Sequence, residues 1–147
     1  ISYTIMTLGA FGMIILMSRA GFDANEINDF RGLNDRNPWM AFVMLLIMFS
    51  LAGIPPIVGF IAKVGVLEAL IQSHLVWLAV LAILFAVIGA YYYLNVVKVM
   101  YFEDAEAGAK PVAIPGDMTM AITLNAIAVL FLGIFPGALF ALSQLKF

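Results

Sequence analysis

The chain has no cysteine, a single histidine and few charged residues. The lack of cysteine excludes disulfides, thiolate metal ligands and a cysteine nucleophile, and one histidine cannot build a metal centre alone. Charged residues make up 11% of the 147 residues, whereas a soluble domain carries about 25%. The net charge of −2 argues against nucleic-acid binding. Hydrophobic residues make up 65% of the chain, its mean hydropathy is +1.09, and this composition indicates a membrane protein.

The apolar residues fall into four blocks, which are residues 1–18, 39–73, 75–100 and 117–143. Each block is about long enough to cross a bilayer as a helix. The polar stretch 19–38 carries seven of the sixteen charged residues, and we expect a short interfacial helix in it, over 25–33. The sequence therefore predicts an all-α, polytopic transmembrane bundle of about four crossings, with residues 1–147 forming a single transmembrane region. Because the chain opens inside an apolar run, we expect it to be a fragment of a longer protein.

The second block, 39–73, is longer than one straight crossing needs and a little short for two. A single crossing would place both long polar loops on the same side of the membrane. That side would collect five of the seven basic residues, Arg19, Arg31, Arg36, Lys98 and Lys110, against Lys146 on the other. Because basic residues concentrate in cytoplasmic loops, we favour one crossing, with both polar loops cytoplasmic and the C-terminus on the outer side.

A helix break is expected in the middle of this block, at Gly53–Pro56. Pro55 and Pro56 lack backbone N–H groups, and each disfavours helix in the residue before it. The helix should therefore stop near residues 52–53 and restart after Pro56, ahead of Gly59. Irregular backbone at membrane depth survives only against protein or a water-filled cavity. Transporters use such discontinuous helices to build ion sites near the midplane.

Lys63 follows the break and is the strongest candidate for a functional residue. It lies roughly 15 Å from the outer end of its helix, near the middle of a hydrocarbon core about 30 Å thick. A charge there costs at least about 3 kcal/mol. Lipid disfavours the charged amine, while carbonyl ends or an acidic partner favour it, so Lys63 could gain and lose a proton as a relay. The alternative is a structural cation paired with a carboxylate.

Four further polar residues are weaker candidates for a proton path. Glu68 lies five residues beyond Lys63, on a different side of the helix, and could instead be a carboxylate near the interface. Tyr91, Asn95 and Lys98 fall at i, i+4 and i+7 and so share one helix face. They could form a hydrated entrance leading to Lys63, or a polar packing stripe with interfacial tyrosines and a snorkelling lysine.

Three stretches of sequence resemble a known family. SLAGIPPIVGFIAK, the later YYYLNVVKVMY and the upstream INDFRGLNDRNPWMA are similar to the antiporter-like membrane subunits of respiratory complex I, NADH:quinone oxidoreductase. The N-type resembles the chain best, because the M-type usually has glutamate in place of Lys63 and the L-type usually has aspartate in place of Val64. The resemblance covers essentially the whole chain, as the C-terminal part of a longer subunit. Subunits of multi-component cation/proton antiporters share the motif.

The resemblance implies a role in proton translocation by an enzyme complex that has no catalytic centre in this chain. Lys63 would be the titrating residue of one of two inverted repeats. NADH, flavin, iron–sulfur clusters and quinone would bind other subunits, and no cofactor or metal would bind here. Partners would be other membrane subunits and the lipid of a bacterial inner membrane. A cation/proton antiporter subunit and a non-conducting scaffold are the alternatives.

Overall fold

The computed structural model describes residues 2–19, 26–105, 116–135 and 137, and all regular structure in these ranges is helical. The elements in chain order are α1 (Ser2–Arg19), the 3₁₀ helix η1 (Ile27–Phe30), α2 (Leu33–Arg36), α3 (Pro38–Ala52), α4 (Val58–Gln72), α5 (Val76–Phe102) and α6 (Gly116–Ile134). The predicted all-α fold is confirmed. The helix boundaries follow the apolar blocks closely, except that the expected end of the fourth block lies outside the described residues.

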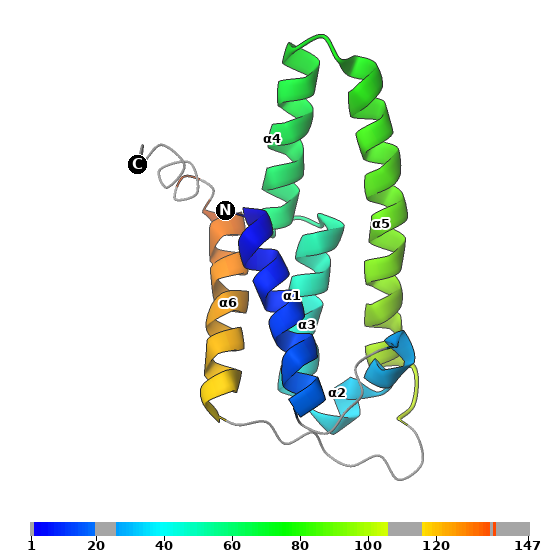
Figure 1. Cartoon of the computed structure of the whole chain (residues 1–147), viewed down its shortest axis with the longest axis vertical. Coiled ribbons are helices and arrows are strands. Elements are labelled where there is room, and N and C mark those ends of the chain that lie inside the picture. The colour runs from blue at the N-terminus through cyan, green and yellow to red at the C-terminus, as the bar shows by residue number, and fades with distance from the viewer. Residues whose placement is uncertain (1, 20–25, 106–115, 136, 138–147) are drawn as a thin grey trace.

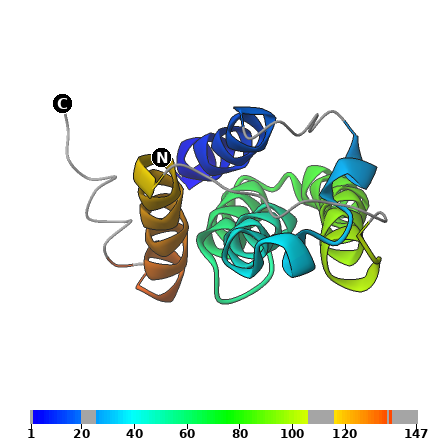
Figure 2. The same ribbon diagram turned by 90° about the horizontal axis from the view of Figure 1, so that it is seen from below.

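The second apolar block runs along the bundle once, as a broken helix. Figure 1 shows α3 and α4 following each other in one direction, while α5 returns beside both of them. Helices α1 and α6 pack against each other and against α3 (Figures 1 and 2). The described helices thus make four passes along the bundle, and α5 and α6 are each long and apolar enough to span a membrane unaided.

The connection between α1 and α3 differs from the single short helix that the sequence predicted. It forms η1 and α2 instead, because Gly32 lies between them with φ +60°. The Gly32 N–H donates to the carbonyl of Val99 at 3.2 Å, and the Arg31 guanidinium lies 2.8 Å from the Glu103 carboxylate. These contacts fix the connection to the end of α5, on the same side of the bundle as the start of α6 (Figure 1).

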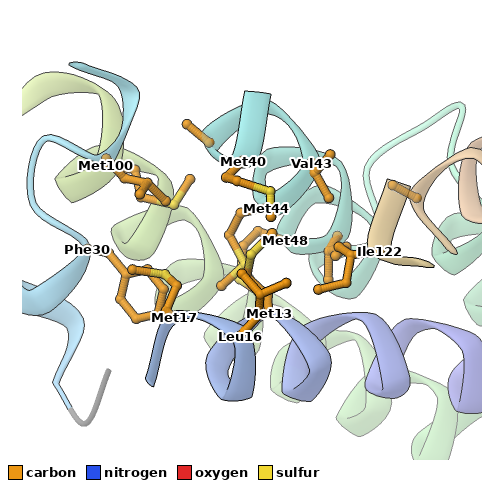
Figure 3. Close-up of a cluster of buried hydrophobic side chains, with 14 of the residues drawn as sticks. Met13, Leu16, Met17, Phe30, Met40, Val43, Met44, Met48, Met100 and Ile122 are labelled. Atoms are coloured by element: carbon orange, nitrogen blue, oxygen red, sulfur yellow. The ribbon is translucent and has the colours of Figure 1, made fainter. Parts of the chain in front are cut away.

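A methionine-rich core joins α1, α3 and α5 below the break. Figure 3 shows several of its side chains pointing toward one another, and its fully buried members include Met13, Met17, Met40 and Met100. Methionine is unbranched and flexible, so it fills irregular gaps between helices. These methionines are packing residues, and the core they form anchors the first half of the broken helix.

Candidate functional site at the break between α3 and α4

The break occurs where the sequence predicts it. Helix α3 ends at Ala52, and Gly53 follows in the left-handed conformation with φ +82°. The Gly53 N–H donates to the carbonyls of Phe49 and Ser50, each at 3.0 Å. Regular helix resumes at Val58. A side chain at Gly53 would be strained by the positive φ, and its Cβ would lie 2.7 Å from Cδ of Lys63.

Lys63 folds back from α4 onto the end of α3. Its Nζ donates to the carbonyl oxygens of Ala52, at 2.7 Å, and Leu51, at 3.0 Å. The last turn of a helix leaves its carbonyls without partners in the helix itself, and an unpaired polar group in the hydrocarbon region costs several kcal/mol. Lys63 therefore caps α3 across the break, which places its amine at the level where the backbone is irregular.

A cavity of about 710 Å³ lies against Lys63. Its wall comes from the start of α1, the end of α3, much of α4 and one face of α5, and includes Tyr3, Met6, Gly53, Phe60, Lys63, Ala82, Ala86, Gly89 and Tyr93. Most of these side chains are apolar, so the lysine amine and the neighbouring carbonyls are among its few polar groups. The Lys63 amine thus lies between the end of α3 and this mostly apolar cavity.

Two carbonyl partners suit both protonation states of Lys63. A neutral amine has two N–H groups, which suffice for Leu51 and Ala52, and it keeps a lone pair that can accept a proton. The ammonium form has three N–H donors, so one donor remains for an acceptor supplied through the cavity. The arrangement can therefore hold the side chain in place while its charge changes.

The other side of the break is covered by protein. Ile57, Val58 and Met6 are buried in a small apolar cluster that also contains Val129 and Leu132 of α6. At Gly133, α6 comes so close to the backbone of residues 56–58 that a Cβ there would collide with it. Irregular backbone in a membrane requires such cover or a cavity, and this break has protein on one side and the cavity on the other.

The structure does not bring the weaker candidates to the cavity wall. Glu68 is exposed on α4. Tyr91 is 69% exposed and makes an edge-to-face contact with Tyr92 at a ring separation of 5.7 Å. Asn95 is half-buried, and Lys98 lies 3.9 Å from Glu103. The roles of these residues in a proton path stay predictions, as does the relay role of Lys63.

Sequence reasoning missed Ser50 and Tyr93. Tyr93 lines the cavity from α5, on the face that carries Ala82, Ala86 and Gly89. Those small residues recur at helical spacing, which was a usable signal, because small residues mark faces where membrane helices approach each other. Ser50 is fully buried at the break and gave no sequence signal. Among the described residues, no group of three His, Cys, Asp or Glu side chains could hold a metal ion.

Comparisons with known proteins agree on one family. Residues 1–89 match the family model described as NADH:quinone oxidoreductase/Mrp antiporter, transmembrane. NADH-quinone oxidoreductase subunit N of Coxiella burnetii is 69% identical over 147 residues, which is all of this chain and 30% of that protein. The same subunit of Thioalkalivibrio sulfidiphilus is 52% identical over 141 residues, 96% of this chain and 29% of that protein. The chain thus spans about a third of the length of these relatives.

The fold also matches a solved structure. A chain in the respiratory complex I of Thermus thermophilus with bound aureothin superposes with a TM-score of 0.75 and 23% identity, over 92% of this chain and 32% of that chain. At this identity the match supports the fold alone. The matches confirm the resemblance to the family and leave the expected C-terminal position within a longer subunit unconfirmed.

Proposed function

The chain belongs to the NADH:quinone oxidoreductase/Mrp antiporter transmembrane family, and we propose that it is part of an N-type, proton-translocating membrane subunit of NADH:quinone oxidoreductase. One observation carries this proposal. A lysine amine is held at a mid-helix break, against two backbone carbonyls and beside a cavity. The identity of 69% to a subunit of that name over the whole chain supports the choice of complex.

Lys63 acts as a proton relay in this proposal. It takes a proton delivered through the cavity, holds it as an ammonium beside the carbonyls of Leu51 and Ala52, and releases it when the surrounding charge changes. The break is useful because it supplies carbonyls that an intact helix would keep for its own N–H groups. Glu68, Tyr91, Asn95 and Lys98 are proposed only as outer parts of the path, since they lie away from the cavity wall.

The remaining parts of the enzyme are assigned to other subunits. NADH, flavin, iron–sulfur clusters and quinone bind elsewhere in the complex, and the chain forms one transmembrane region that contacts other membrane subunits and lipid. The complex lies in the bacterial inner membrane. The polar connections at residues 19–38 and 103–115 face the cytoplasm, and the C-terminus lies on the outer side, because this orientation keeps most basic residues inside.

Purification of the complete subunit tests whether it belongs to an NADH:quinone oxidoreductase or to a cation/proton antiporter. A tagged copy, extracted in mild detergent from its native membrane, should co-purify with NADH-dependent quinone reductase activity. Liposomes that hold the purified complex with its cytoplasmic side outward should acidify their lumen when NADH and a quinone are added, and should show no exchange of sodium for protons in the absence of NADH. Sodium/proton exchange without NADH, and a purified subunit free of reductase activity, would instead identify a cation/proton antiporter.

Labelling of single cysteines tests the orientation. In a cysteine-free background, Asp35→Cys and Asp104→Cys should react with an impermeant thiol reagent from the cytoplasmic side only, and Ser73→Cys from the outer side only. All three side chains are exposed, and Ser73 lies at the opposite end of the bundle, between α4 and α5. Reaction of Asp35→Cys and Asp104→Cys from different sides would contradict the single broken crossing in the membrane.

A further inference from the structure

Helix α4 needs a partner for its own first turn. The first N–H groups of any helix point out of its N-terminal end and have no acceptors in the helix itself. The residue before α4, Ile57, has no side chain that could accept from them. The Phe60 N–H turns back to the Ile57 carbonyl at 3.0 Å. The Gly59 N–H has a different acceptor, the hydroxyl oxygen of Ser50 at 3.2 Å.

Ser50 is a fully buried side chain that reaches across the break from α3. Its exposed fraction is 0%, so its hydroxyl must satisfy its hydrogen bonds within the protein. The oxygen accepts from the Gly59 N–H, and the O–H donates to the sulfur of Met6 on α1 at 2.9 Å. One hydroxyl thus joins three helices at the point where the broken helix restarts.

The two halves of the break cap each other. Lys63 of α4 donates to the carbonyls of Leu51 and Ala52, and Ser50, the residue just before that pair, accepts from Gly59. Gly59 and Lys63 are four residues apart, so they lie one turn apart on the same face of α4. The position of Gly59 on Ser50 therefore determines where the Lys63 side chain meets the end of α3.

Gly59 is in contact with the backbone of Ser50 as well as with its hydroxyl. A Cβ at Gly59 would collide with the Ser50 carbonyl oxygen, so the contact needs both a residue without a side chain on α4 and a hydroxyl on α3. The close contact between Ser50 and Gly59, nine positions apart, fixes the height and rotation of α4 relative to α3.

We propose that Ser50 is a positioning residue for Lys63: its hydroxyl, bound to Gly59, sets the register of α4 that holds the lysine amine on the Leu51 and Ala52 carbonyls. The inference rests on the proposed function, because it assigns the effect of Ser50 to proton transfer through Lys63. Without the hydroxyl, the Gly59 N–H has no acceptor in α3, and the start of α4 shifts to find one. The amine then spends less time on the carbonyls and beside the cavity.

The test compares variants of the complete subunit in the assembled complex, reconstituted in vesicles. Ser50→Ala removes the hydroxyl. Ser50→Thr and Ser50→Val have nearly the same shape, so their comparison isolates the hydroxyl from the added bulk. Ser73→Ala, an exposed serine at the other end of α4, serves as the matched control. The measured quantity is the number of protons pumped per electron, with the amount of assembled complex determined separately by native gel.

Ser50→Ala and Ser50→Val should lose about half or more of the pumping that Lys63→Met loses, whereas Ser50→Thr and Ser73→Ala should pump like wild type. Assembly should stay the same in all four. Equal pumping by Ser50→Thr and Ser50→Val, or wild-type pumping by Ser50→Ala, would overturn the proposal. So would a loss of assembly in Ser50→Ala that Ser50→Thr restores without any change in protons per electron, since Ser50 would then be a structural cap only.

The same vesicles separate this inference from the proposed function. If Lys63→Met itself pumps like wild type, the relay role of Lys63 fails, whatever the serine variants do. If Lys63→Met lowers pumping and Ser50→Ala does not, the relay stands and the positioning role of Ser50 is wrong.

Discussion

Replacing Lys63 with methionine should lower proton pumping several-fold while the complex still assembles. Methionine keeps the length and apolar character of the side chain, so it fits against the same mostly apolar wall. It removes the group that takes and releases the proton. The carbonyls of Leu51 and Ala52 lose their donor, at a cost of about 1–3 kcal/mol for each group that stays unpaired. The measurement is protons pumped per electron during NADH oxidation in reconstituted vesicles, normalised to assembled complex.

Lys63→Arg separates a relay from a structural cation. The guanidinium stays charged at any usable pH, so a relay should fail almost as badly with arginine as with methionine. A structural cation predicts the reverse order, because arginine keeps the charge and can still donate to the carbonyls, while methionine leaves any partner carboxylate unpaired. Gln72→Met is the control, since Gln72 is exposed at the end of the same helix and lies outside the cavity wall. Wild-type pumping by Lys63→Arg would show that Lys63 does not relay protons.

The break and its lysine could be predicted because both depend on local chemistry. Two adjacent prolines cannot continue a helix, and the stop at Ala52 and restart at Val58 fall where Pro55 and Pro56 place them. Counting residues puts Lys63 roughly 15 Å from the end of its helix, because the rise per residue is constant, and α4 does end at Gln72. The depth of Lys63 in the membrane stays a prediction. The bonds from Lys63 to the carbonyls follow from the same facts, since the broken helix leaves those groups unpaired.

The apolar pattern of α5 does not predict which of its faces packs, because the helix is apolar on nearly all sides. Only the small residues Ala82, Ala86 and Gly89 mark the face toward α4. Only Ala79, Val97, Val99 and Met100 of its residues are buried in the described chain. A helix that is hydrophobic on all sides has no periodic pattern to show which side packs against its neighbours. Tyr91, Asn95 and Lys98 share one face, as their spacing requires, but that face is not the one toward α4, and Tyr93 lines the cavity instead.

The role of Ser50 could not be predicted from the sequence, for a different reason. A lone serine in an apolar helix has many uses, and its hydroxyl commonly bonds within its own helix. Its bond to Gly59 exists only because the irregular backbone at residues 53–57 sets the start of α4 beside the end of α3. Contacts of this kind depend on three-dimensional geometry, which neither periodicity nor composition encodes.

Gly59 is the residue whose replacement should disturb the break most. An alanine Cβ at this position would collide with the Ser50 carbonyl oxygen, and it would lie 3.1 Å from the Met6 sulfur. The sulfur can move, but the carbonyl belongs to the backbone of α3, which the methionine-rich core anchors. Overpacking of a rigid site costs about 1–3 kcal/mol and occasionally more, and we expect the upper end here because backbone must shift. The shift would also break the Gly59–Ser50 hydrogen bond.

Gly65→Ala is a control in the same helix, because it is expected to leave the stability of the complex unchanged or to raise it slightly. No atom of the described chain other than its own helix and neighbours lies within 4 Å of a Cβ at Gly65, and alanine favours helix over glycine by about 1 kcal/mol. Gly59→Ala should therefore reduce the amount of assembled complex, its thermal stability in detergent and the protons pumped per electron, while Gly65→Ala leaves all three unchanged or slightly raises stability. Equal behaviour of the two variants would mean that α3 and α4 do not approach as closely as the structure shows. The crossed caps formed by Ser50 and Lys63 would then be excluded, since both depend on that approach.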